Sequence, residues 1–175
     1  MSSILKVDTI QTTAGAAPTA KDLGFAAGSV IQVQVARYSG GSNNMNTGSY
    51  TTSGRSITIT PKFANSLILI RYTAVSYVDS QVHGYFTFYR NGTNLYNQSG
   101  YSTNSSTNHQ GLMQISSANG SCFFPSAGEF ADSSHNSTSA LTYTLYGKLV
   151  SGSGGIYWPP GSVDGATFTA MEIAQ

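Results

Sequence analysis

Aliphatic and polar residues alternate along residues 30–37, where VIQVQVAR places Ile31, Val33 and Val35 at every second position. A period of two predicts a β-strand, because successive side chains of a strand point to opposite faces of the sheet. We expect this strand to bury its aliphatic face and to expose its glutamines. Residues 56–60 (SITIT) repeat the alternation and predict a second strand.

The strongest strand signal follows a turn expected at residues 61–65. Residues 67–77 (LILIRYTAVSY) are rich in β-branched and aromatic residues and are almost continuously apolar in their first half. This pattern is typical of a strand at the centre of a sheet. Farther on, Asn91 and Gly92 lie between aromatic-rich flanks in residues 84–97. We expect a β-hairpin there, because Asn-Gly readily adopts the positive φ angles of a tight hairpin turn.

Four further segments have strand character, and loops rich in Gly, Asn and Ser separate them. The chain has no amphipathic pattern long enough for a three-turn helix and no internal repeat. These features predict an all-β fold, specifically an antiparallel β-sandwich or jelly roll. The further strands are expected at residues 111–116, 140–150, 156–158 and 166–173.

The first 28 residues differ from the rest, which divides the chain into an arm and linker (1–28) and a β domain (29–175). The arm contains one short apolar stretch followed by a run of small residues. It has too few apolar groups to offset the entropy of ordering by itself. We therefore expect it either to become ordered against another surface or to add an edge strand to its own domain. The apolar stretch consists of Ile4, Leu5, Val7 and Ile10.

Charge is scarce: 9% of residues are charged, the formal net charge is +1, and 26 Ser, 19 Thr, 11 Asn and 19 Gly supply polarity in 175 residues. Without a cluster of Lys or Arg the chain cannot neutralise a run of phosphates, so we expect no nucleic-acid partner. The apolar runs are too short to cross about 30 Å of hydrocarbon, and no basic segment followed by a long apolar one opens the chain. We therefore expect a soluble protein without membrane insertion or an ordinary signal peptide.

The residues that could bind a metal are few and scattered. His83, His109 and His135 are far apart in sequence and have no metal-ligand spacing, which favours surface or turn histidines. The single Cys122 can form neither an internal disulfide nor a thiol pair for zinc, and its default interpretation is a small buried apolar residue. We expect no metal and no cofactor.

Catalytic patterns are equally sparse. No G-x-S-x-G nucleophile elbow occurs, and the chain has only seven acidic residues. Glycoside hydrolysis needs two carboxylates at a defined separation. The closest pair in sequence, Glu129 and Asp132, is interpreted as a solvated loop pair. We therefore expect a protein that is not an enzyme.

Aromatic residues carry more information, because the chain has 11 Tyr, 8 Phe and 1 Trp. One group lies on expected strands and is assigned to core or intersubunit packing. A second group borders loops of Ser, Gly and Asn, a composition that resembles adaptable binding surfaces and suits sugars. The alternative for this second group is packing onto the end of the sandwich. The strand group is Tyr72, Tyr77, Phe86, Phe88, Tyr143 and Phe168, and the loop group is Tyr38, Tyr101, Tyr157 and Trp158.

The opening SSILKVDTIQTTAG resembles the start of virion structural and tail-fibre proteins of tailed phages, especially marine and cyanobacterial ones. Four later segments, GSVIQVQ, ITPKFANSLILI, GEFADSSHNSTSALTYTLYGK and FTAMEIA, resemble the small β domain that often follows in those proteins. The chain departs from longer fibres in having no shaft between arm and domain. The resemblance therefore implies a short spike, a head fibre or a capsid decoration protein as well as a tail fibre.

Two segments, LILIRYTAVSY and GYFTFYRNGTNL, together with a final aromatic strand, are similar to the jelly roll of the C1q and tumour-necrosis-factor families. Members of that fold are trimers with aromatic packing along the three-fold axis. The similarity implies a homotrimer in which Tyr72, Tyr143, Phe168 or their neighbours line that axis.

These expectations combine into a non-enzymatic structural protein of a phage virion, assembled in the host cytoplasm. In the leading interpretation it is a short trimeric appendage whose arm residues Ile4, Leu5, Val7 and Ile10 dock onto tail or major capsid proteins. Its distal loops, with Tyr38, Tyr101, Tyr157 and Trp158, would meet a host-surface glycan. The alternative is a capsid decoration or cement protein. A third hypothesis is a carbohydrate-active enzyme that uses Glu129 or Asp132 at clefts between subunits.

Overall fold

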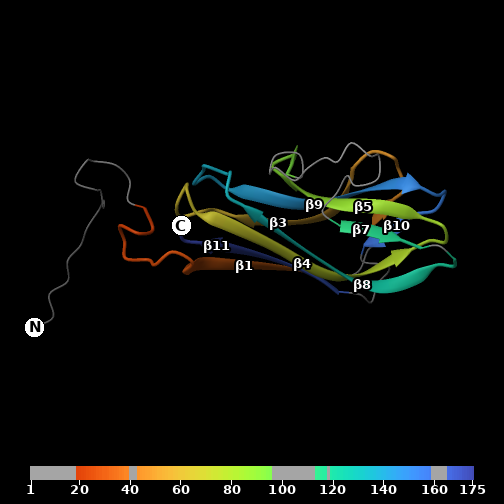
Figure 1. Ribbon diagram of the computed structural model, residues 1–175, viewed down its shortest axis with the longest axis horizontal. Coiled ribbons are helices and arrows are strands. Elements are labelled where there is room, and N and C mark those ends of the chain that lie inside the picture. Colours follow the sequence, from red (N-terminus) through yellow and green to blue (C-terminus); the bar gives the residue numbers. More distant parts are fainter. Residues whose placement is uncertain (1–18, 40–42, 96–112, 118, 159–164) are drawn as a thin grey trace, which may run out of the picture.

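A computed structural model describes residues 19–39, 43–95, 113–117, 119–158 and 165–175. These residues form two antiparallel β-sheets that lie against each other as a sandwich, and the described part of the chain contains no helix. Figure 1 shows the two layers, with β1, β11, β4 and β8 in one and β3, β9 and β5 in the other. The predicted all-β sandwich is confirmed.

The first layer, sheet A, is organised around β4. Along one side β4 pairs with β8, and along the other it pairs first with β11 and then with β10. β1 pairs with the outer side of β11, and β2 with the outer side of β10. The strands of sheet A are β1 (Val30–Ser39), β2 (Asn43–Met45), β4 (Leu67–Val78), β8 (Cys122–Asp132), β10 (Ile156–Trp158) and β11 (Gly165–Ile173).

The second layer, sheet B, has β9 and β5 at its centre. Consecutive long strands alternate between the sheets, since β3 belongs to sheet B, β4 to A, β5 to B, β8 to A, β9 to B and β11 to A. Such crossing connections are those of a jelly-roll-like sandwich. The strands of sheet B are β3 (Thr51–Ile59), β5 (His83–Arg90), β6 (Thr93–Asn94), β7 (Met113–Ser116) and β9 (Leu141–Ser151).

The core between the sheets is aromatic. The ring of Tyr72 packs edge-on against Trp158 at 5.0 Å and Phe88 at 5.6 Å between ring centroids, and Phe168 packs against all three. Each of these four side chains is at most 2% exposed. Large rings bury much apolar surface in few residues, which compensates for the low aliphatic content of this chain.

The predicted hairpin at Asn91 and Gly92 is confirmed. Their φ angles are 48° and 84°, and the residues on either side of the turn pair as β5 with β6. The Asn91 side chain also ties the turn to β9, because its Oδ1 accepts the N–H of Thr142 at 2.9 Å.

The orientation predicted for β1 holds for Ile31, which is partly buried, and for Gln34, which is exposed, but it is wrong for Val33, Val35 and Gln32. Val33 and Val35 are 48% and 54% exposed, whereas Gln32 points inward and donates from Nε2 to the Glu172 carboxylate at 2.6 Å. The cause is a register shift between Val30 and Gln32, which changes the face on which the following residues lie.

One long strand, β8, was not predicted. Its sequence CFFPSAGEFAD contains Pro125 and Gly128, which weaken a strand pattern, and it lies at the margin of sheet A where such residues are tolerated. Gly128 pairs with Tyr72, and a Cβ built at Gly128 would overlap the Tyr72 ring. The glycine therefore makes room for a central core side chain.

Residues 19–28, the end of the predicted arm, pack onto the β domain. Ala20 is buried against Phe63 and Ala174, and the Gly28 N–H donates to the Ala174 carbonyl at 2.9 Å. The ring of Phe25 meets Phe63 edge-on at 6.2 Å. These ten residues belong structurally to the sandwich and form no strand there, while residues 1–18 lie outside the described part.

Substituting Gly128→Ala should lower the free energy of unfolding by about 1–3 kcal/mol, because the added methyl group must displace a tightly packed Tyr72 ring. Urea unfolding measures this loss, and Gly48→Ala is the matched control because a Cβ at Gly48 has nothing within 4 Å. Equal effects of the two substitutions would contradict this account of Gly128.

Candidate assembly interface

The outward face of sheet A is apolar at the end nearer the chain termini. Val33, Met171, Leu69 and Ala131 are successive cross-strand partners on β1, β11, β4 and β8. Each is half-buried or exposed, as are Leu67 and Ile173 in the next row. Neighbouring side chains on one face of a sheet lie within contact distance, so these rows form one continuous apolar surface.

At the opposite end the same face carries a row of rings. Asn44, Tyr157, Tyr77 and Phe123 are successive partners on β2, β10, β4 and β8. The Tyr77 ring centroid lies 4.8 Å from that of Phe123 and 5.6 Å from that of Tyr157, and the Asn44 Nδ2 donates to the Tyr157 Oη at 3.1 Å. Phe123 is 64% exposed, an unusual position for a phenyl ring.

Between these ends the outward face is polar and charged. Thr169 on β11, Arg71 on β4 and Glu129 on β8 are successive partners, and Arg37 lies farther along β1. Arg37, Arg71 and Glu129 are exposed. Among the residues that the structure describes, the ion pair with an N–O distance within 4 Å joins Arg90 and Asp132. Arg37, Arg71 and Glu129 therefore form no ion pair within the described part of the chain.

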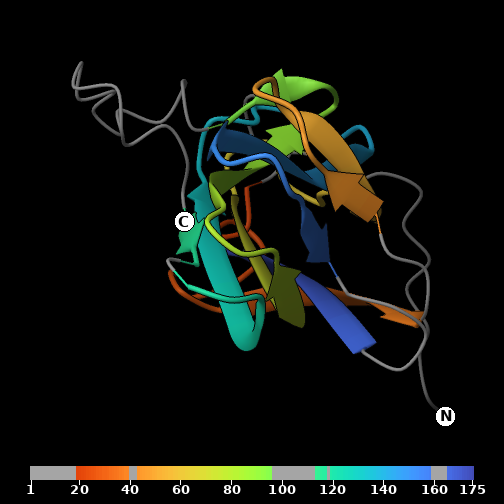
Figure 2. The same ribbon diagram turned by 90° about the vertical axis from the view of Figure 1, so that its right-hand side faces the viewer.

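Strand β4 indicates what this face is for. Its even-numbered residues point into the core, while Leu67, Leu69, Val75 and Tyr77 point outward and remain half-buried, with exposed Arg71 and Thr73 between them. A sheet with one face in water normally alternates apolar and polar residues, so a strand apolar on both faces is typical of a sheet covered on both sides. In Figure 2 the ribbon of β8 forms one margin of this sheet. Contiguous apolar surface of this kind marks an interaction site.

The residues predicted to line a trimer axis lie elsewhere. Tyr72, Tyr143 and Phe168 are at most 2% exposed and pack inside their own sandwich. The prediction that they contact another subunit is therefore wrong, because their side chains have no surface left to offer. The outward aromatic residues of sheet A are Tyr77, Tyr157 and Phe123.

The residues predicted to face a receptor are scattered. Trp158 is fully buried and donates from Nε1 to the Ser126 Oγ at 3.0 Å, so its assignment to a receptor-facing loop is wrong. Tyr38 lies half-buried on β1, where its hydroxyl donates to the Ser56 carbonyl and accepts the Ser56 N–H. Tyr157 lies on the outward face of sheet A. Tyr101 and the docking residues Ile4, Leu5, Val7 and Ile10 fall outside the described residues.

The two acidic residues of GEFAD lie on opposite faces of β8, so they do not form the predicted solvated loop pair. Glu129 points outward, whereas Asp132 is 1% exposed and accepts bonds from the Arg90 Nη1 at 2.7 Å and the Tyr143 Oη at 2.8 Å. Burial raises the pKa of Asp132, but the hydrogen bonds from Tyr143 and Ser134 and the Arg90 charge outweigh it, so the pKa is lowered. Asp132 thus acts as a structural anion.

A second buried carboxylate, Glu172, fixes the turn before β4. It accepts the N–H groups of Lys62 at 2.8 Å and Phe63 at 2.9 Å, the Ser66 hydroxyl at 2.8 Å, and the amide of Gln32. Burial raises the pKa of Glu172, yet these donors stabilise the anion and lower the pKa overall.

His135 belongs to the same region and lies in the connection between β8 and β9, as the turn alternative predicted, but it is buried, so the surface alternative is wrong. Its Nε2 lies 2.8 Å from the Ser66 carbonyl oxygen, and its Nδ1 lies 3.2 Å from the Ser137 amide nitrogen. His83 is half-buried on β5, and His109 lies outside the described residues. Within those residues no three His, Cys, Asp or Glu side chains gather as a metal site.

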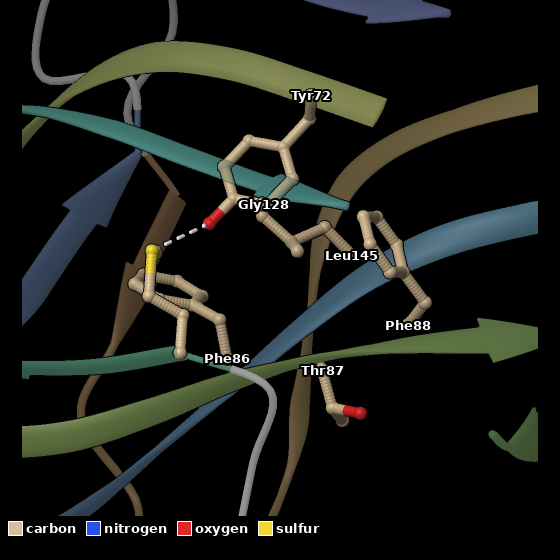
Figure 3. A pocket seen from close by; sticks show the side chains of 7 residues that line it. Tyr72, Phe86, Thr87, Phe88, Gly128 and Leu145 are labelled. Carbon is tan, nitrogen blue, oxygen red and sulfur yellow. Dashed lines mark hydrogen bonds between the residues drawn. The ribbon is translucent and has the colours of Figure 1, made fainter. Parts of the chain in front are cut away.

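A crevice opens between the sheets beside β8 and β7 (Figure 3). The Tyr72 hydroxyl points into it and donates to the Met113 Sδ at 3.1 Å. Burial raises the pKa of Tyr72, so the phenol stays neutral. The crevice offers packing surface and no charged group. Its lining is Tyr72, Phe86, Thr87, Phe88, Met113, Gly128 and Leu145.

No family model matches this sequence, and a search of the curated proteins found no match. The described residues include no helix with the length and hydrophobicity needed to span a membrane.

Of the outward-facing residues of sheet A, Tyr77 and Tyr157 were singled out from the sequence, but the apolar residues at the other end of the face were missed, although one signal for them was present. The nearly continuous apolar run LILI was used only to place its strand centrally. Such a run is typical of a strand covered on both faces, and the sandwich covers only one face of this strand. Phe123 carried no such signal, because its strand had not been recognised.

Replacing Glu172 by Gln should lower the free energy of unfolding by about 2–3 kcal/mol near pH 7, because the charge-assisted bonds to the turn are lost. The pKa of Glu172 is below its ordinary value of 4.5, so the anion contributes fully above that pH and loses its contribution as pH falls through the lower, folded-state pKa. Urea unfolding should show that the difference in free energy of unfolding between wild type and Glu172→Gln becomes smaller between about pH 7 and about pH 3. A difference that stays constant over this pH range would contradict the conclusion that ionised Glu172 stabilises the turn.

Proposed function

We propose that this chain is a non-enzymatic structural protein of a phage virion, and that it works as a homotrimer held together through the outward face of sheet A. The observation that carries the self-association is the apolar surface at the two ends of that face, where Val33 and Phe123 are about half exposed or more. A symmetric oligomer buries such a surface without a second kind of protein, because every copy carries the same apolar face.

The composition supports a second copy as the partner. With 9% charged residues and a formal net charge of +1, copies of this chain repel one another little. The central strands of the face carry Thr167, Thr169 and Thr73, which can make polar contacts without a large desolvation cost. A trimer therefore needs no other protein to cover the apolar rows.

The virion assignment is supported by the resemblance of SSILKVDTIQTTAG to the start of phage appendage proteins. In this proposal Ile4, Leu5, Val7 and Ile10 dock the arm onto a tail or capsid protein, and the sandwich projects as a short fibre or spike. Contact with a host-surface glycan falls to Tyr101, because Trp158 is buried and Tyr157 belongs to the face proposed for self-association.

The native mass of the purified full-length chain, measured by light scattering after size exclusion, should equal three chains. Val33→Asp should weaken the trimer about tenfold or more, since a carboxylate would be buried in the apolar row of Val33, Met171 and Leu69. The matched control is Val150→Asp, on sheet B, where the side chain is 39% exposed and no loss is expected. A monomeric wild-type protein, or equal effects of both substitutions, would sink the proposed interface.

Quantitative mass spectrometry of purified phage particles tests the virion role. A copy number that scales with a single vertex or tail fits the appendage, and one that scales with the shell fits a capsid decoration protein instead. Absence from the particle would refute both. Adsorption that persists undiminished in Tyr101→Ala particles would refute the assigned glycan contact.

A further inference from the structure

The two margins of sheet A carry opposite charges. Arg37 lies on β1 at one margin and Glu129 on β8 at the other, and both side chains are exposed. In the part of the chain that the structure describes, neither side chain makes an ion pair. Arg71 is the cross-strand partner of Glu129 on β4, yet the two are not within ion-pair distance. Both margins thus hold a charge that has no partner in its own subunit.

The margins also hold the most exposed large apolar side chains of sheet A. Val30, Val33 and Val35 on β1 are 48–54% exposed, and Phe123 on β8 is 64% exposed, whereas the outward residues of β4 and β11 between them are mostly half-buried. A contact that buries only the middle of the sheet would leave these side chains in water. A contact between margins buries them together with both charges.

Three-fold symmetry restricts which margins can meet. Around a three-fold axis every interface is heterologous, so one region of a copy contacts a different region of the next. Contacts between two β1 margins or two β8 margins do not satisfy this condition, and they would place like charges together at a cost. Contact of a β1 margin with the β8 margin of the next copy satisfies both the symmetry and the charges.

We propose that in the homotrimer the β1 margin of each copy contacts the β8 margin of the next, with the Arg37 guanidinium opposite the Glu129 carboxylate. The inference rests on the proposed function and identifies the partner surface of the same site. The contact is made by side chains. Pro125 interrupts the free margin of β8, because its pairing with β4 is continuous and its missing N–H faces away from that strand.

Charge reversal tests this arrangement in the full-length chain. Analytical ultracentrifugation at low salt should show about tenfold or greater weakening of the trimer for Arg37→Glu and for Glu129→Arg, since each places like charges together. The double variant Arg37→Glu/Glu129→Arg should recover most of the loss, because the pair is restored with its signs exchanged. Lys21→Glu is the matched control for Arg37→Glu: it makes the same change in net charge at an exposed side chain outside sheet A and should leave the trimer intact.

A second measurement does not depend on the strength of the pair. In a Cys122→Ser background, Arg37→Cys/Glu129→Cys treated with a short bifunctional thiol reagent should give covalently linked dimers and trimers on a denaturing gel. Mixed samples of the two single-cysteine variants should give linked dimers only. Absence of linked species from a trimeric double-cysteine variant would overturn the contact between margins.

The outcomes separate this inference from the proposed function. A wild-type protein that is a monomer or a dimer refutes the homotrimer and this contact together. A wild-type trimer in which the double charge reversal is as weak as the single variants refutes the Arg37–Glu129 pairing and leaves the homotrimer standing. Recovery in the double variant, with cross-linking through the two cysteines, supports both.

Discussion

The position of β4 constrains the whole molecule. It is hydrogen-bonded along both sides, to β8 on one and to β11 and β10 on the other, so every strand of sheet A is placed relative to it. Its inward residues Ile68, Ile70 and Tyr72 build the core, and its outward residues make the face proposed for assembly. Because its side chains alternate strictly, a shift by one residue would exchange the two faces. Core packing and the proposed assembly therefore depend on the same register.

Two buried carboxylates support that register at the start of β4, because Glu172 and Asp132 are the cross-strand partners of Ile68 on its two sides. Glu172 holds the turn that leads into β4, and Asp132 joins β8 to Arg90 on β5 and Tyr143 on β9. A chain with only seven acidic residues thus spends two of them as buried anions. Buried charges cost free energy unless they are fully paired, and here each carboxylate has several donors, which favours one arrangement over alternative pairings. The chain therefore has few charges overall, and two of its acidic residues have structural roles inside the fold.

The sequence predicted the sandwich, the central strand and the Asn91–Gly92 hairpin, because period-two alternation and turn chemistry are local properties. It did not predict β8, since Pro125 and Gly128 are unfavourable in an isolated strand. Pro125 is tolerated because β8 lies at the margin of the sheet, and Gly128 is needed because the Tyr72 ring packs against it. The orientation predicted for Val33, Val35 and Gln32 on β1 was wrong because the register shift near Ile31 leaves no mark on the hydrophobic pattern. Trp158 was assigned to a binding loop and Tyr143 to a trimer axis because a sequence does not distinguish a buried hydrogen-bonded ring from one at a surface or interface. Partners such as Ser126 and Asp132 become visible only in three dimensions.

Residues 19–28 are attached beside Ala174, so the described chain enters the sandwich at one defined end. The described chain begins at the end of the sandwich where β11 finishes, and Figure 1 places the C-terminus there and β10 toward the opposite end. Any larger body holding this chain by the residues before Thr19 would hold it at that end. The row of Asn44, Tyr157, Tyr77 and Phe123 would then lie at the far end of the sandwich, away from that body.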